Sequence, residues 1–413
     1  MYFTPKRLKL YLFALLALQL VPLVWALVVL HTPRGHYIDL RSFYTAGYML
    51  RTHQPSLLYD YPTEQRLQTA LVSPDPRALP MMSPPFTALL FVPLSYLSFG
   101  QAHAIFAALN ILFLLACVAL LKPFLTALSA RWSLTPALLF LTFLPMTLVL
   151  VLGQLSILLL LLYCACFVCL RRNRNLFAGL ILSLALIKFQ IALPAALLFL
   201  LWRQWRFTTG FLTGSALLTA LSIRITGLAP FLAYLHSLVS MTTSVTANRA
   251  IQLQFAILPE QMPNLYGLLF TLTRGAAWSH ILILTLSAGL FLFTALQRPS
   301  LPLALLTAML VSYHLFFYDL TLLLLPVALL ANHLLRRPEP TPNQPRDLRL
   351  LITQISLGVL LLMPLICLFI TGDPYLFAVP ILALILASTW WPSLHGPPDP
   401  APIPEPAAVS SAT

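Results

Sequence analysis

The sequence predicts an all-α polytopic membrane protein. Of its 413 residues, 59% are hydrophobic and 8% are charged, and the mean hydropathy is +0.88. Soluble domains carry about 25% charged residues. Apolar stretches follow one another from Leu8 to Trp391, interrupted at lengths near the roughly 20 residues that cross a bilayer. Helices are expected because lipid offers no water to pair with backbone polar groups.

The first apolar run, Leu8 to Leu30, follows basic residues as a signal peptide would. It is too long for the apolar region of a signal peptide, and no small-residue cleavage site precedes His31. We therefore expect a retained first span.

Basic clusters predict the topology. They share one face if the chain crosses the membrane twice between neighbouring clusters, and the positive-inside rule makes that face cytoplasmic. The clusters comprise Lys6, Arg7, Lys9, Lys122, Arg131, Arg171, Arg172, Arg174, Arg203, Arg206, Arg298, Arg336 and Arg337. About twelve spans result: near 8–30, 103–121, 134–152, 154–170, 176–187, 190–202, 207–227, 278–296, 301–316, 319–335, 350–370 and 375–391.

One transmembrane domain, residues 1–391, is expected. Residues 176–202 are too few for two full crossings, so they predict a bent or re-entrant hairpin with Lys188 at its tip. Two larger extracytoplasmic loops are predicted at 31–101 and 228–277. The Pro- and Ala-rich segment 392–413 predicts a disordered cytoplasmic tail.

Charge, cysteines and motifs exclude several functions. The net charge is +13, but most basic residues lie at span ends, so no nucleic-acid partner is expected. Cys164, Cys166 and Cys169 lie in an apolar run without a companion histidine, which favours packing over a metal site. No nucleotide-binding loop, dinucleotide fingerprint or HExxH pair is present.

The unusual polar residues fall at the outer ends of the predicted spans, which indicates one extracytoplasmic site. They are Asp39, Gln154, Lys188, His314 and Asp319. Asp39 has aromatic neighbours and could accept a proton from a hydroxyl. An ordinary loop carboxylate paired with Arg41 or Arg34 is equally compatible with the local sequence.

Lys188 is a lone cation in an apolar segment, where a phosphate would offset the cost of burying its charge. Snorkelling to the interface is the alternative. Arg224, Arg249 and Arg274 are further outer-side cations that could grip a phosphate.

His314 and Asp319 interrupt an apolar stretch. They favour a functional site, although an aspartate that caps the next helix would also explain Asp319. Their spacing also matches the H-x4-D pattern of glycerolipid acyltransferases, which nothing else here supports. The amide of Gln154, after Gly153, suits a sugar hydroxyl.

Several segments together resemble bacterial glycosyltransferase family 87, over residues 37 to 335. They are, in order, Asp39 with Tyr44; Pro55 to Tyr59; Ser83-Pro84-Pro85-Phe86 with Pro93-Leu94; Gly153-Gln154; Gly179 to Lys188 with Arg203-Gln204-Trp205-Arg206; and Tyr318-Asp319-Leu320. The resemblance implies a GT-C-type bundle in the bacterial inner membrane and a polyprenyl-phosphate sugar donor, such as polyprenol-phosphate mannose. It makes Asp39 the catalytic base, His314 a second catalytic-site residue and Tyr44 a substrate-site residue.

The mechanism implied is inverting transfer of a hexose or pentose to a lipid or envelope-glycan acceptor. Lys188 and the outer-side arginines would meet the leaving phosphate. No resident cofactor is expected, and a divalent metal is not favoured because no second acid stands near Asp39 in the sequence. Two other classes stay open: a transporter or lipid flippase, and a noncatalytic subunit of an envelope-assembly complex.

Overall fold

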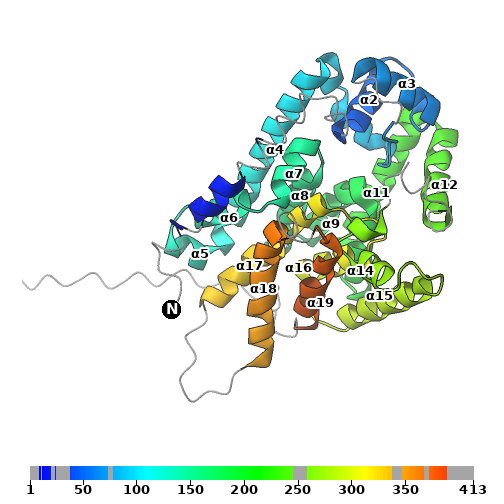
Figure 1. Cartoon of the computed structure of the whole chain (residues 1–413). Coiled ribbons are helices and arrows are strands. Elements are labelled where there is room, and N and C mark those ends of the chain that lie inside the picture. The colour runs from blue at the N-terminus through cyan, green and yellow to red at the C-terminus, as the bar shows by residue number, and fades with distance from the viewer. Residues whose placement is uncertain are drawn as a thin grey trace, which may run out of the picture.

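The computed structural model describes residues 9–10, 12–19, 24, 38–72, 78–244, 258–336, 347–366 and 372–387. Within these ranges the chain is helical and has no β-strand, which confirms the predicted all-α class. The long helices form a bundle, and a group of short helices around α2 and α3 lies at one end of it (Figure 1).

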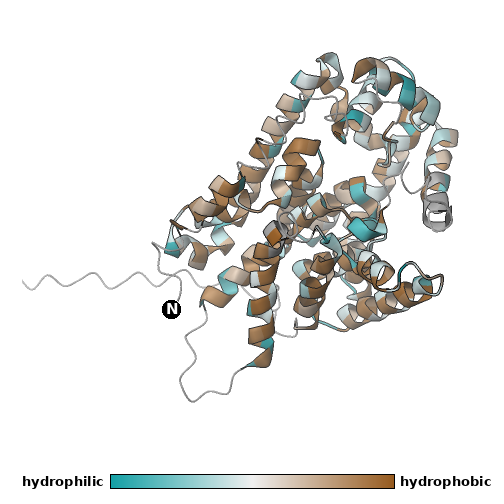
Figure 2. Ribbon diagram, viewed as in Figure 1, coloured by the Kyte–Doolittle hydropathy of each residue, from teal (hydrophilic) through white to brown (hydrophobic). Residues whose placement is uncertain are grey.

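The short helices come from the predicted first outer loop, and we call residues 38–98 the cap. Its elements are α2 (Leu40–Arg51), η2 (Pro55–Leu57), α3 (Tyr61–Leu71), η3 (Pro85–Phe91) and η4 (Leu94–Tyr96). The cap residues Leu40, Met49 and Phe91 belong to a second hydrophobic cluster, to which the bundle contributes Phe106, Leu155 and Ile187. Gly47 allows α2 and η3 to touch, because a Cβ atom there would lie 2.5 Å from the Phe91 carbonyl oxygen. Hydrophilic residues gather on the cap more than on the bundle (Figure 2).

The bundle begins with α4, which runs from the cap to the region of α5 and α6 (Figure 1). The elements up to the predicted second loop are α4 (Phe99–Leu121), η5 (Lys122–Phe124), α5 (Thr126–Arg131), α6 (Thr135–Leu141), α7 (Pro145–Leu152), α8 (Ser156–Arg171), α9 (Asn175–Leu184), η6 (Ala185–Lys188), α10 (Phe189–Leu201), α11 (Trp205–Thr226) and α12 (Leu228–Ser244). At Gly227, with φ of 85°, the chain bends by 115° between α11 and α12.

The C-terminal half supplies the centre of the bundle. Its elements are η7 (Pro259–Gln261), α14 (Leu265–Leu272), α15 (Ser279–Ala295), α16 (Leu301–Val311), η8 (Phe317–Leu323), α17 (Leu324–Arg336), α18 (Leu348–Ile366), η10 (Pro374–Phe377) and α19 (Ala378–Leu386). Residues 301–310 of α16 are all buried. A helix that is apolar on every side is stable only where other helices or lipid surround it. The helix α16 accordingly lies inside the bundle.

By length and composition alone, three helical segments among the described residues could cross a membrane: Phe99–Phe124, Asn175–Leu201 and Phe317–Arg336. Two bent pairs, α6 with α7 and α11 with α12, raise the number to five if each is one span. Most other predicted spans coincide with shorter apolar helices of 10–17 residues. The number of about twelve stays a prediction. The run 8–30 is only partly described, and Arg249 and residues 392–413 lie outside the described ranges.

The segment Asn175–Leu201 folds back on itself at η6. A Cβ atom on Gly179 would lie 2.0 Å from the carbonyl oxygen of Phe207. A straight helix would carry Leu201 about 33 Å from Gly179, and the six residues from Leu201 to Phe207 reach about 20 Å at most. The packing therefore agrees with the expected hairpin, with Lys188 at its turn.

Small residues allow α9 and α11 to pack backbone against backbone. Gly210 and Gly214 are four residues apart on α11, and Cβ atoms there would lie 2.0 Å from the Leu176 carbonyl oxygen and the Ser183 hydroxyl. Such close approach is the usual use of small residues between helices in lipid. The turns that hold Arg174 and Arg203 consequently lie together, at the end of the bundle away from Lys188.

Candidate active site

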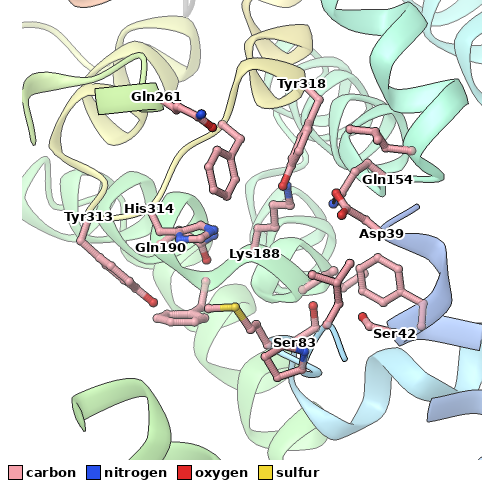
Figure 3. Close-up of a pocket in the computed structure, with 18 residues that line it drawn as sticks. Asp39, Ser42, Ser83, Gln154, Lys188, Gln190, Gln261, Tyr313, His314 and Tyr318 are labelled. Atoms are coloured by element: carbon pink, nitrogen blue, oxygen red, sulfur yellow. Dashed lines mark hydrogen bonds between the residues drawn. The ribbon is translucent and has the colours of Figure 1, made fainter. Parts of the chain in front are cut away.

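A cavity of about 320 Å³ lies where the cap meets the bundle, within the 300–1,000 Å³ typical of ligand pockets. Figure 3 shows the polar side chains that converge on it. The described residues that line it are Asp39, Ser42, Phe43, Leu79, Pro80, Met82, Ser83, Leu152, Gln154, Ile187, Lys188, Phe189, Gln190, Gln261, Tyr313, His314, Phe316 and Tyr318. Four of the predicted site residues, Asp39, Gln154, Lys188 and His314, thus share one cavity.

Asp39 stands directly before α2 and accepts a hydrogen bond of 2.5 Å from the Gln154 amide. Burial raises the pKa of Asp39 from 3.8 to about 6, and this outweighs the lowering by the Gln154 hydrogen bond and by the charges of Lys188 and Arg41. A carboxylate with a pKa near neutrality is suited to act as a general base.

Gly153 makes the Asp39–Gln154 contact possible. It ends α7 in the left-handed conformation, with φ of 66°, and its backbone lies against Leu40. A Cβ atom on Gly153 would lie 2.6 Å from the Cβ atom of Leu40, the residue after Asp39. Glycine is needed here both for the backbone angle and for the close approach.

We predict that Gly153→Ala lowers the turnover at this site by about tenfold or more, because a sub-ångström displacement of a catalytic group costs activity on this scale. The methyl group pushes Leu40, and Asp39 with it, away from Gln154. Gly289→Ala is the matched control, since nothing lies within 4 Å of a Cβ atom there. Steady-state rates with both purified variants test this, and equal rates for Gly153→Ala and wild type would contradict it.

Lys188 and Asp319 form an ion pair between the hairpin turn and η8. Asp319 is fully buried; its Oδ1 also accepts from the Ser156 hydroxyl at 2.6 Å, and its Oδ2 accepts from the Phe316 amide at 3.2 Å. Asp319 therefore caps η8, as the capping alternative predicted, and pairs with Lys188 as well. The Lys188 ammonium also lies 4.6 Å from the centre of the Tyr318 ring.

His314 lies in the loop between α16 and η8. Its amide donates to the Ser312 hydroxyl at 3.3 Å, that hydroxyl donates to the His314 carbonyl at 2.9 Å, and Asn264 donates to the Ser312 carbonyl at 2.6 Å. Burial lowers the pKa of His314 to about 4, so the ring is neutral at pH 7. Its Nδ1 atom is buried and has no hydrogen-bond partner among the described residues.

Four predicted substrate-site residues lie away from the cavity lining, and of these Asp319 contacts a lining residue through its ion pair with Lys188. The Tyr44 hydroxyl donates to the Leu97 carbonyl at 2.8 Å inside the cap, and its ring packs edge-on against Phe99. Arg224 and Arg274 are exposed, at the end of α11 and after α14. Lys188 is the one Lys or Arg side chain among the described residues that line the cavity.

The cavity contains polar residues that were not predicted as site residues: Ser42, Ser83, Gln190, Gln261, Tyr313 and Tyr318. Gln190 follows Lys188 by two positions in an otherwise apolar hairpin, and Tyr318 precedes Asp319, so both carried a local signal. Gln261 carried none, since its position depends on how η7 packs.

Hydrogen bonds from α3 hold the backbone of one wall of the cavity in place. Gln68 makes two hydrogen bonds to the backbone of Leu79, of 2.8 and 2.9 Å, and Glu64 accepts from the Met81 amide at 2.9 Å. Tyr59 donates to the Ser83 carbonyl at 2.8 Å. The cap thereby fixes the segment that faces Asp39.

Metal-ligating side chains are scattered in the described part of the chain. No group of three or more His, Cys, Asp or Glu side chains is placed there to hold a metal ion. Cys164 and Cys166 are buried free thiols in the bundle core, as the packing interpretation predicted.

The fold and the cavity define a helical membrane protein with a partly enclosed polar site. Comparison with protein-family models matches residues 83–326 to glycosyltransferase family 87. The match covers more than half of the chain, so the protein belongs to glycosyltransferase family 87 and is a membrane glycosyltransferase with a sugar donor and an acceptor. Neither the curated proteins nor the solved structures gave a match. The matched range begins after Asp39, so the role of Asp39 rests on geometry.

Proposed function

We propose that this glycosyltransferase moves a monosaccharide from a polyprenyl-phosphate donor to a lipid or envelope-glycan acceptor, with inversion, on the outer side of the bacterial inner membrane. The observation that carries the proposal is one cavity that holds both a carboxylate with a raised pKa and a lysine. The first can activate a hydroxyl, and the second can meet a phosphate.

The reaction is a single displacement. Asp39 takes the proton from an acceptor hydroxyl, and the oxygen forms a bond to the anomeric carbon of the donor sugar. The bond between that carbon and the phosphate oxygen breaks, and polyprenyl phosphate leaves with the bonding pair. Attack opposite to the leaving group inverts the anomeric centre. Gln154 holds the Asp39 carboxylate in position through the hydrogen bond from its amide.

Lys188 stabilises the negative charge that grows on the leaving phosphate. An ammonium group has three donors; one bonds Asp319, a second lies 3.4 Å from the Ser156 hydroxyl, and the third is free for a phosphate oxygen. The donor phosphate is thus assigned to the middle of the cavity, between Asp39 and His314 in Figure 3. The proposed chemistry uses no metal, because Lys188 provides the positive charge.

The distribution of basic residues supports the proposed outer-side placement. Arg174 and Arg203 lie in turns at the opposite end of the bundle from Lys188, and cytoplasmic ends carry the excess of positive charge. A donor whose sugar is presented outside and whose tail stays in lipid suits a cavity at the membrane surface.

The test is transfer by the purified full-length protein in proteoliposomes. Mannosyl, glucosyl and arabinosyl polyprenyl phosphates are supplied with a lipid extract of envelope acceptors, with and without EDTA. We expect chelator-resistant transfer from one of these donors without any partner protein. Counter-ion-dependent uptake without transfer would replace the proposal with a transporter, and activity only with an added subunit would indicate a noncatalytic role.

We predict that the transfer rate rises with pH through about pH 6. Asp39 accepts a proton only when ionised, and its pKa is raised from 3.8 to about 6, so the active fraction falls below that pH. Gln154→Leu removes a hydrogen bond that favours the ionised form, so the rise should move to higher pH. The measurement is kcat/KM for the acceptor against pH. A flat profile, or a move to lower pH in Gln154→Leu, would contradict the assignment.

A further inference from the structure

We propose that Gln190, Gln261 and His314 form the subsite that binds the hydroxyl groups of the transferred sugar and selects which sugar is used. This inference rests on the proposed function and deepens it. The three residues come from α10, η7 and the loop after α16, and all line the cavity.

The cavity has two chemically different sides. In Figure 3, Asp39 and Gln154 lie on one side, Gln190 and His314 lie together on the opposite side, and Lys188 stands between them. Gln261 is the exposed member of the three. The first side carries charge, and the second is neutral because the His314 ring is uncharged at pH 7. The side without charge suits an uncharged polyhydroxyl ring better than a phosphate.

The side-chain polar atoms on the neutral side have no hydrogen-bond partners among the described residues. Within the described part of the chain, neither the Gln190 nor the Gln261 side-chain amide has a hydrogen-bond partner, and the buried Nδ1 of His314 has none. A buried polar group without a hydrogen-bond partner destabilises the protein, so a ligand or water that bonds Nδ1 removes that cost. Each glutamine amide has two donors on nitrogen and an acceptor oxygen, which matches neighbouring hydroxyls that both donate and accept.

Rigid surroundings make this side suitable for discrimination between sugars. The Ser312 and Asn264 hydrogen bonds fix the backbone of His314, and the Phe316 ring lies edge-on against its imidazole at 4.7 Å. Phe189 and Tyr313, with ring centres 6.0 Å apart, provide apolar faces for the C–H groups of a sugar. The volume of about 320 Å³ corresponds to about ten water molecules, enough for one sugar ring with its phosphate.

The test separates the sugar from the phosphate by binding. Full-length protein with Asp39→Asn, which prevents turnover, is titrated with polyprenyl phosphate and with the same lipid carrying mannose, glucose or arabinose. The sugar increment is the ratio of the two dissociation constants for the best sugar. We expect Gln190→Ala, Gln261→Ala and His314→Ala each to reduce this increment by about tenfold, with little change for the lipid without sugar. Lys188→Met should weaken the binding of the lipid without sugar and leave the sugar increment little changed.

Gln204→Ala is the matched control, because Gln204 lies in the turn before α11, at the other end of the bundle. Unchanged sugar increments in all three subsite variants would overturn the subsite and leave the proposed function intact. If the parent protein binds neither lipid, the proposed function fails and the subsite fails with it. A general loss of both affinities would mark a folding defect, which His314→Gln, with its retained hydrogen-bonding amide, separates from the loss of one contact.

Discussion

Asp39→Asn should reduce glycosyl transfer by about 10²- to 10⁴-fold, the usual contribution of a general base. The amide oxygen of an asparagine can still accept the hydrogen bond from Gln154, so the geometry is kept while the proton acceptor is lost. Transfer from the preferred polyprenyl-phosphate sugar is measured at pH 8, where the wild-type carboxyl, with a pKa of about 6, is ionised.

The folded protein should tolerate this change. The pKa of Asp39 is raised on folding, so its ionisation lowers the free energy of unfolding as the pH rises from 3.8 to about 6. A neutral amide avoids that loss, and the unfolding temperature at neutral pH should be equal or higher. Asp60→Asn is the matched control, because Asp60 caps α3 in the same cap and an asparagine caps equally well. Near-normal transfer by Asp39→Asn would remove the base assignment.

Breaking the buried ion pair should cause the largest loss of stability. Lys188→Met leaves the Asp319 carboxylate, which is fully buried, without its cation. Removal of one partner from such a pair costs about 3–5 kcal/mol. Unfolding of the purified protein in mixed micelles measures the change, and Asp319→Leu should show a loss of similar size.

The paired variant Lys188→Met/Asp319→Leu separates structure from function. Replacing both charges with apolar side chains of similar size is often neutral for stability, so most of the lost free energy of unfolding should return. Donor use should stay low, because no cation then meets the phosphate. Recovery of wild-type transfer in the paired variant would show that Lys188 serves the fold alone.

Local sequence was sufficient to predict much of the fold. Apolar runs of limited length predicted helices that coincide with α4, α8, α15 and α17, because burial in lipid depends on each segment separately. The hairpin at Lys188 was predictable because too few residues separate Arg174 from Arg203 for two crossings. Asp39 and Lys188 were conspicuous as charges in an apolar chain.

Other features depended on contacts between distant segments. Asp39 meets Gln154 across 115 positions, and Lys188 meets Asp319 across 131. Arg224 has the charge that a phosphate contact needs and was predicted on the outer side. It lies near the end of α11, however, where its side chain is exposed. Tyr44 follows Asp39 by five positions, yet its hydroxyl is used inside the cap.

The sequence by itself determined that this is a helical membrane protein of family 87 and which few charges lie outside its apolar helices, because hydrophobicity and charge are properties of each segment. The tertiary structure alone decided which of those charges share a cavity. That choice rests on close approaches such as that of Gly153 to Leu40, which places Gln154 beside Asp39, and on the ion pair that holds Lys188 against η8. Such approaches depend on the shapes of two distant segments at once, and no local pattern records them.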